Sequence, residues 1–443
     1  MQSKRDQKEL GMMLLPPLES FIPEDYRLRK LNKVLDLSFI HEAVRGHYCQ
    51  DNGRPSVDPE VVIRLFLLQA MEGIRSVREL MREVQVNLGY RWFIGYSLEE
   101  NLPDHSTLSK ALDRFGDEVF NGLFERSIEQ CRASGLIEGK VLHVDATTIR
   151  ADMDRYHRGD GAGSDKDARV GRFPGGDKLP GYKQQTVVDD HKGVILSVGV
   201  TPADRHDHDG AVEAVDAAME HLAGPPEAVC ADAAYGSGQN RAAMEARGVR
   251  LISPPPKVPQ GEYFSADNFR YDEKNDCFIC PAGAVLRCLG RVKARPRQKR
   301  YISSKRDCQR CGFKERCTTA SRRQIQVSAH HAALIRLRID SHTDSFRRLY
   351  RRRAPVIEGL FAEAKNWHGL RRAWRRGLPK MCIQCLLIAA VINFKRLMTA
   401  FLYYCHCESA AIPILRRIID RIKPNRYNFV DMEKYIYGFA SAS

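Results

Sequence analysis

The stretch from Gly139 to Ala151, GKVLHVDATTIRA, holds the feature on which the expected fold depends: a charged residue directly after an apolar run. The run VLHV at 141–144 is rich in β-branched residues and predicts a buried strand, with Asp145 at its end. A buried carboxylate is costly unless it is paired or binds a metal. Taken alone, Asp145 is equally compatible with an ordinary strand-end or turn position.

Two further acids occupy comparable positions. Asp232 ends the apolar strand EAVCAD at 227–232, and Glu358 lies in a segment with apolar residues at helical spacing. That apolar stripe consists of Ile357, Leu360, Phe361 and Ala364. Three carboxylates that hold two divalent ions can activate a water or a 3′-hydroxyl and stabilise the leaving oxygen of a phosphodiester. The ordered set of strand, strand and helix therefore predicts a metal-dependent phosphoryl-transfer site.

Length, charge and cysteine content limit the class of protein. The 443 residues suffice for two or three domains, and the net charge of +15, from 70 Lys and Arg against 55 Asp and Glu, favours a polyanionic partner such as nucleic acid. We find no apolar run of about 20 residues and no signal peptide, so no membrane partner is expected. Thirteen cysteines without a secretory signal indicate a reducing compartment, with free or metal-bound thiols.

Residues 1–135 are expected to form a helical domain. Asp58 followed by Pro59 predicts one helix start, the SVRE box at 76–79 a second, and DHSTLS at 104–109 a third. Short helices with a polar turn and nearby basic residues are compatible with a helix-turn-helix that reads DNA, for which 106–115 is the candidate. A plain helical bundle explains the same pattern almost as well.

Residues 136–255 are expected to form an α/β unit. The pattern reads as three strands, a helix, a strand, a helix and a strand, with a Gly- and Asp-rich loop at 159–181. This order is similar to that of the ribonuclease H-like fold, a mixed sheet flanked by helices. In that fold the first and fourth strands are neighbours, so Asp145 and Asp232 are expected to meet.

Residues 256–330 form a cysteine-rich, basic insertion. Its cysteines are Cys277, Cys280, Cys288, Cys308, Cys311 and Cys317. Paired CxxC spacings predict a small zinc ribbon, with Cys317 and Cys277 competing for one ligand position; buried reduced thiols are the alternative. The segment 287–306 is rich in Lys and Arg without an acid, which fits either a phosphate-binding ribbon or a solvated loop.

Residues 331–400 are expected to be helical and to complete the core with Glu358, and 401–443 to form a C-terminal tail. Arginines crowd both sides of Glu358, as expected where DNA lies across a metal site, although an acid among arginines can also be a simple ion-pair partner. Pro355 lies three residues before Glu358, so the helix is expected to restart or kink there. Cys382 and Cys385 lie in an apolar helix and are assigned to the core.

These motifs together resemble the DDE transposases of bacterial insertion sequences. The resemblance rests on HVDATTIRAD, GYK, VTPADRHD, CADAAYGS and the spacing Tyr350-x2-Arg353-x4-Glu358-x6-Lys365, and it covers roughly residues 15 to 400. It implies a ribonuclease H-like core with Asp145, Asp232 and Glu358 binding two Mg²⁺ (or Mn²⁺) ions. It also implies one structural Zn²⁺ on Cys280, Cys308, Cys311 and Cys317, with Cys280 preferred over Cys277.

The resemblance further implies cleavage at the ends of a mobile element and strand transfer into target DNA. The expected DNA contacts are Lys183, Arg297, Lys299, Arg300, Tyr350, Arg353 and Lys365. The expected partner is double-stranded DNA, bound by a homo-oligomer in the bacterial cytoplasm at the nucleoid. No GxxxxGK[ST] motif occurs, so ATP is not expected. The alternatives are a nuclease without strand transfer, an inactive DNA-binding regulator and, as a non-enzyme, a zinc-ribbon interaction protein.

Overall fold

The chain folds into two compact units. The computed structural model describes residues 16–48, 56–153, 165–206, 210–257 and 261–409, with side chains described as far as 402. The first unit comprises Met1–Ser134, Ala364–Arg375 and Pro379–Ser443, and the second comprises Gly135–Glu363 and Arg376–Leu378. Residues from Ala364 onward, expected to complete the core, thus group with the N-terminal helices. From residue 410 the expected tail lies outside the described residues.

The first unit is helical, as the sequence predicts. Its elements are η1 (Leu18–Phe21), α1 (Arg27–Val34), α2 (Ile40–Val44), η2 (Arg45–His47), α3 (Pro59–Glu72), α4 (Val77–Val86), α5 (Leu88–Phe93), α6 (His105–Ala133) and, beginning at its border, α13 (Leu378–Ser409). The Asp58 side chain caps α3 by accepting a hydrogen bond from the Glu60 N–H at 2.7 Å, and Ser76 caps α4 in the same way. Within α6 the helix is interrupted at Gly116, which has φ +66°, a backbone conformation that glycine adopts readily.

Helix α13 supplies apolar core to the first unit. Cys385 is fully buried, and Asn393 donates a hydrogen bond to Ser127 of α6 at 3.1 Å. By length and composition the segment Leu378–Leu402 is long and apolar enough to cross a membrane, contrary to the sequence expectation, but 67% of its most apolar window is buried inside the structure. That burial is typical of the core helix of a folded unit.

The second unit is built on a six-stranded mixed sheet. Its strands are β1 (Val141–Arg150), β2 (Arg169–Arg172), β3 (Lys178–Asp189), β4 (Ile195–Pro202), β5 (Ala228–Cys230) and β6 (Arg250–Ile252). The order is β2-β3-β1-β5-β6, and β4 also pairs with β3. Strand β1 is antiparallel to β3 and parallel to β5. With α7 (Ala211–Met219), η3 (Ala233–Tyr235) and α8 (Gly238–Glu245) between strands, this α/β core resembles the ribonuclease H-like fold, and the predicted fold class is confirmed at that level.

Two details differ from the expected strands. β1 continues to Arg150, so Asp145 lies in mid-strand, because antiparallel pairing with β3 persists to Gly181 after parallel pairing with β5 stops at His143. The expected loop at 159–181 contains β2 and the start of β3, although 154–164 lie outside the described residues. The segment 169–172 is short and mostly polar, and it forms a strand because its backbone pairs antiparallel with β3.

The insertion folds as a five-stranded antiparallel sheet. Its elements are η4 (Ala266–Asn268), β7 (Arg270–Asp272), β8 (Cys277–Ile279), β9 (Val285–Val292), β10 (Arg295–Ile302), α9 (Lys305–Gln309), α10 (Lys314–Cys317) and β11 (Gln324–Ser328). The strands follow the order β11-β10-β9-β8-β7 around their own buried cluster, which includes Phe269, Phe278, Leu286 and Tyr301. The sheet is therefore larger than the predicted ribbon.

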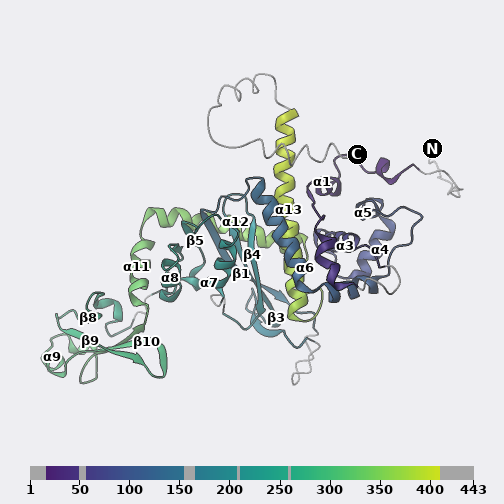
Figure 1. Ribbon diagram of the computed structural model, residues 1–443. Helices are drawn as coiled ribbons and strands as arrows, with labels where there is room; N and C mark the ends of the chain where they lie inside the picture. Colours follow the sequence, from purple (N-terminus) through teal and green to yellow (C-terminus); the bar gives the residue numbers. More distant parts are fainter. Residues whose placement is uncertain (1–15, 49–55, 154–164, 207–209, 258–260, 410–443) are drawn as a thin grey trace, which may run out of the picture. The chain divides into compact units, whose positions relative to one another are not determined.

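Helices α11 (His331–Ser341) and α12 (Asp344–Trp367) pack on one face of the mixed sheet, and Figure 1 shows α12 running beside β1 and β5. Leu337 and Phe346 share a buried cluster with Cys230 of β5. α12 is one helix with Pro355 inside it, so it does not restart there. Pro355 cannot donate the backbone hydrogen bond of a helix, which destabilises α12 at that point. Burial of the apolar stripe on both sides of the proline offsets this loss.

Candidate active site

The register of β1 on β5 brings the two predicted aspartates to the same level. His143 is the parallel partner of Cys230, and Asp145 and Asp232 each follow these partners by two residues. Residues two apart on a strand point to the same face, so Asp145 lies on the same face of β1 as His143 and meets α12 there, whereas Asp232 follows the end of β5. The paired register thus ends two residues before each of the Asp residues that the sequence predicts to be neighbours.

Asp232 leaves the strand and begins a short helical turn. Its side chain accepts a hydrogen bond from the Ala234 N–H at 2.9 Å, and its own carbonyl accepts one from Ser253 at 2.5 Å. The residue is half-buried. One carboxylate oxygen is therefore committed to the turn, and the turn fixes where the side chain points.

Asp145 is paired with an arginine of α12. Arg353 donates to the Asp145 carboxylate at 2.5 Å, and the two side chains are only 10% and 18% exposed. The other carboxylate oxygen accepts the Ala146 N–H at 2.8 Å, and the fully buried Thr186 of β3 is the cross-strand partner of Asp145. The Asp145 carboxylate is thus fixed in orientation, and the guanidinium of Arg353 compensates its negative charge.

Glu358 does not join this pair in the structure. Its side chain is exposed, five residues along α12 from Arg353, which corresponds to about 140° around the helix. Among the described residues, no three His, Cys, Asp or Glu side chains come close enough together to hold a metal ion. Asp145 is held by Arg353 of α12, Asp232 begins the turn after β5, and Glu358 is an exposed residue of the same helix as Arg353.

A second arginine ties α12 to β1 through a buried histidine that the sequence analysis missed. His143 is fully buried, and its Nε2 lies 2.7 Å from Asp190, whose other oxygen accepts from Arg352. Burial, together with the Arg352 and Arg353 guanidinium groups, lowers the pKa of His143 to about 4, so the ring is neutral at pH 7 and donates to Asp190. The DDHK turn at 189–192 was the only sequence signal for this contact.

Several expected DNA contacts are engaged within the protein. Tyr350 packs against the buried cluster under α12 and stacks on Phe346, and Arg353 is held by Asp145. Lys183 donates to the Arg205 carbonyl at 2.6 Å, and burial lowers the pKa of Lys365. These roles in DNA binding stay predictions.

In the insertion, the basic residues divide into two kinds. Arg297 and Arg300 are exposed, whereas Lys299 pairs with Asp276 at 2.9 Å. Asp276 also accepts hydrogen bonds from Tyr301 at 2.6 Å and Tyr271 at 2.8 Å. Lys299 therefore belongs to an internal polar cluster of the insertion, and its neighbours on β10 face solvent.

The predicted zinc ligands lie in the same part of the insertion. Burial raises the pKa of Cys317, with further effects from the charges of Arg323 and of Cys308, Cys311 and Cys280. The Ala284 N–H donates to the Cys280 sulfur at 3.2 Å, and Ser303 lies 3.0 Å from the Cys308 sulfur. All ten described cysteines are free thiols. Their chemistry suits Zn²⁺, but they are not gathered into a metal cluster as they stand.

The acids suit a hard divalent ion in the same chemical sense. Asp145 in β1 and Asp232 after the end of β5 offer the oxygen ligands that Mg²⁺ prefers, and the Arg353 guanidinium already places a positive charge beside Asp145. The donor set therefore fits Mg²⁺ at Asp145 and Asp232, while Glu358 lies apart from it.

Two family models match the chain: Transposase domain (DUF772) over residues 16–114 and Transposase DDE domain over residues 279–398. The second match contains Glu358 and the four predicted zinc ligands, and Asp145 and Asp232 precede it. No curated protein matches the chain.

Solved structures with some likeness are also transposases. One is the piggyBac transposase synaptic complex with hairpin DNA, at 11% identity, covering 90% of this chain and 86% of that chain, with a TM-score of 0.37. Another is the Mos1 transposase paired-end complex with left transposon end, at 11% identity, covering 46% and 61%, with a TM-score of 0.16. We draw no conclusion about fold or site from likenesses this remote. The N-terminal helices thus match a transposase domain, and the stretch from the insertion through most of α13 matches a transposase DDE domain.

Proposed function

We propose that this protein cuts DNA at the ends of its own mobile element and joins the freed 3′-ends to target DNA. The observation that carries the proposal is the parallel pairing of β1 with β5, in which Asp145 and Asp232 each follow the last paired residues, His143 and Cys230, by two positions. The DDE family match supports a phosphoryl-transfer enzyme. The basic charge of +15 supports double-stranded DNA as the partner.

In this proposal Asp145 and Asp232 hold Mg²⁺ or Mn²⁺, and Glu358 completes the site from α12. The bound ions supply activation of the attacking oxygen and stabilisation of the leaving oxygen. Asp232 keeps its orientation through the Ala234 N–H, and Asp145 through the Ala146 N–H. Arg353 neutralises Asp145 and fixes α12 at that point. We further propose a homo-oligomer on DNA in the bacterial cytoplasm, with one structural zinc at Cys280, Cys308, Cys311 and Cys317.

The test uses a plasmid that carries the element with its flanking DNA, incubated with purified protein and Mg²⁺. Asp145→Ala and Asp232→Ala are expected to reduce end cleavage by roughly 100-fold or more, because each removes a metal ligand. Glu213→Ala, which removes an exposed acid of α7, is the matched control and should cleave normally.

Joined products distinguish a transposase from a nuclease. Cleavage without joined products would assign the protein to the nucleases that share the site. If either Asp variant cleaved at the wild-type rate, that residue would not belong to the site and the proposed mechanism would be refuted.

A further inference from the structure

Arg353 is tied to the fold through a single acidic side chain. Its Nη2 donates to Asp145 Oδ2 at 2.5 Å, and Asp145 is its one hydrogen-bond partner among the described residues. The two side chains are 10% and 18% exposed, so little water surrounds the pair. Each charge therefore depends on the other, because either one left alone would be largely buried and unpaired.

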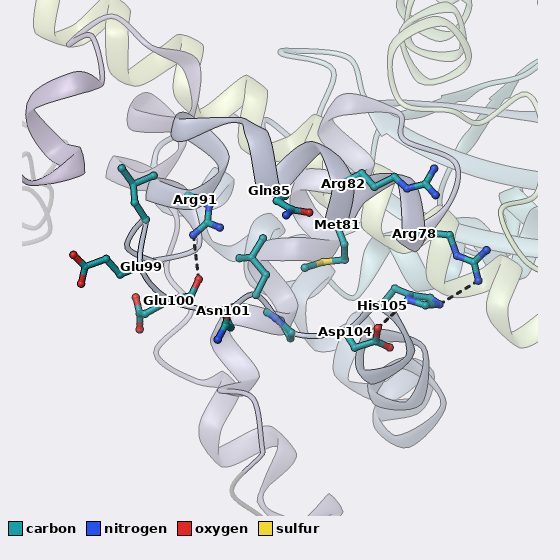
Figure 2. A pocket seen from close by; sticks show the side chains of 13 residues that line it. Arg78, Met81, Arg82, Gln85, Arg91, Glu99, Glu100, Asn101, Asp104 and His105 are labelled. Carbon is teal, nitrogen blue, oxygen red and sulfur yellow. Dashed lines mark hydrogen bonds and ion pairs between the residues drawn. The ribbon is translucent and has the colours of Figure 1, made fainter. Parts of the chain in front are cut away.

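Arg91 of α5, in the first compact unit, shows how this protein holds an arginine that supports the fold. It is 8% exposed, as Arg353 is, and it donates to the main-chain carbonyls of Ser97 and Glu100. Figure 2 shows Arg91 beside Glu100, with this contact drawn. The acceptors of Arg91 are neutral groups of the adjoining loop. The acceptor of Arg353, in contrast, is a carboxylate that the proposed function assigns to a metal ion.

Of the two aspartates proposed as ligands, Asp145 is the one covered by a cation. Asp232 accepts the Ala234 N–H at 2.9 Å and has no ion-pair partner in the part of the chain that the structure describes. Asp145 accepts the Ala146 N–H with one oxygen and Arg353 with the other. A divalent ion on this carboxylate would lie close to the guanidinium, and positive charges repel strongly where little water separates them. Arg353 and a divalent ion can therefore share Asp145 only at a large cost.

We propose that Arg353 competes with the divalent ion for Asp145 and so controls how tightly the site binds metal. The inference rests on the proposed function, in which Arg353 has only the tasks of neutralising Asp145 and fixing α12. The adjacent Arg352 provides the contrast, because it is 56% exposed and pairs with Asp190 rather than with Asp145. Two neighbouring arginines of α12 thus have different tasks, and only one of them covers a metal ligand.

The test measures metal binding rather than cleavage, on the full-length chain without DNA. Mn²⁺ is the probe, because electron paramagnetic resonance measures the free ion directly. Arg353→Gln removes the charge but keeps an amide that can donate to Asp145, and it is expected to bind Mn²⁺ at least about tenfold more tightly than the wild type. Arg352→Gln removes the same charge from the adjacent position and is the matched control, with an expected change of less than about threefold.

A double variant shows whether the gain in affinity belongs to Asp145. When Asp145→Ala is combined with Arg353→Gln, the gain should vanish, because the carboxylate for which the two cations compete is gone. Circular dichroism confirms that each variant is folded. If Arg353→Gln does not fold, Arg353→Lys tests the same point. Its more strongly hydrated ammonium pairs less well with a carboxylate than a guanidinium does, so it should bind Mn²⁺ severalfold more tightly than the wild type.

The outcomes separate this inference from the proposed function. If the folded Arg353→Gln protein binds Mn²⁺ no more tightly than Arg352→Gln, or if Arg353→Lys shows no gain where it replaces that variant, Arg353 does not compete with the metal and this inference alone is overturned. If the gain survives in the double variant, Asp145 is not the carboxylate concerned, and the proposed function loses this ligand as well.

Discussion

Replacing Asp190 should loosen the attachment of α12 to β1, and the structure indicates by how much. The Asp190 side chain is 7% exposed and accepts from the fully buried His143 and from Arg352, which is 56% exposed. Asp190→Ala leaves the buried imidazole N–H without its acceptor, which costs about 2 kcal/mol within a range of 1–3. Loss of the exposed Arg352 pair adds at most about 1 kcal/mol.

The chain has two units, so the free energy lost in Asp190→Ala is best measured locally. Hydrogen exchange of the β1 amides, followed by mass spectrometry, gives that local value. A loss of about 2 kcal/mol corresponds to roughly 30-fold faster exchange. Asp190→Asn keeps an acceptor for His143 and should change exchange by less than about fivefold. Arg352→Ala is the matched control for the exposed end and should do the same. If Arg352→Ala speeds exchange as much as Asp190→Ala, the buried hydrogen bond is not what holds this contact.

Three further predictions concern the insertion. Burial acts to raise the pKa of Asp276, but hydrogen bonds from Tyr301, Lys299 and Tyr271 hold that pKa at about 2. The stability that the Asp276 carboxylate contributes is therefore full above about pH 4 and is lost as the pH falls toward 2. Hydrogen exchange of β9 and β10 amides, corrected for intrinsic rates, should show this loss of stability, and Asp276→Asn should abolish the pH dependence. Neutralising Arg297 and Arg300 should weaken binding to all DNA and reduce the salt dependence of that binding by up to about one unit of slope per phosphate contact, measured by anisotropy. Lys299→Ala should instead mainly destabilise the insertion, because Lys299 pairs with Asp276. If all three substitutions weakened DNA binding equally and left stability unchanged, Lys299 would not differ from the two arginines. Elemental analysis should find one zinc per chain, lost in Cys308→Ser; a folded wild-type protein without zinc would refute the assignment.

The strand order of the core is predictable because β5, β6 and the first part of β1 are short apolar runs bounded by glycine, proline or acids. The last β1–β5 pair, His143 with Cys230, then lies two residues before Asp145 and Asp232. The insertion was harder to predict, since most residues of β9 and β10 are exposed, half of β10 is basic, and their sheet depends on a few inward residues such as Leu286 and Tyr301. A pattern with so few apolar positions does not distinguish a five-stranded sheet from a ribbon or a loop.

The rotation of α12 about its own axis can also be predicted from the sequence, from the spacing of its apolar residues. Ile357, Leu360, Phe361 and Ala364 define a buried stripe, and the structure buries all four. Extending that stripe backward by four residues from Ile357 reaches Arg353, which points at β1 for the same reason that Ile357 does. Arg353 is therefore committed to Asp145 by the helix's own periodicity. Glu358 lies about 100° from Ile357, at the edge of the stripe, where one face meets the core and the other meets solvent. A helix held in this rotation presents its arginine to the Asp145 carboxylate and leaves its glutamate exposed, apart from that carboxylate.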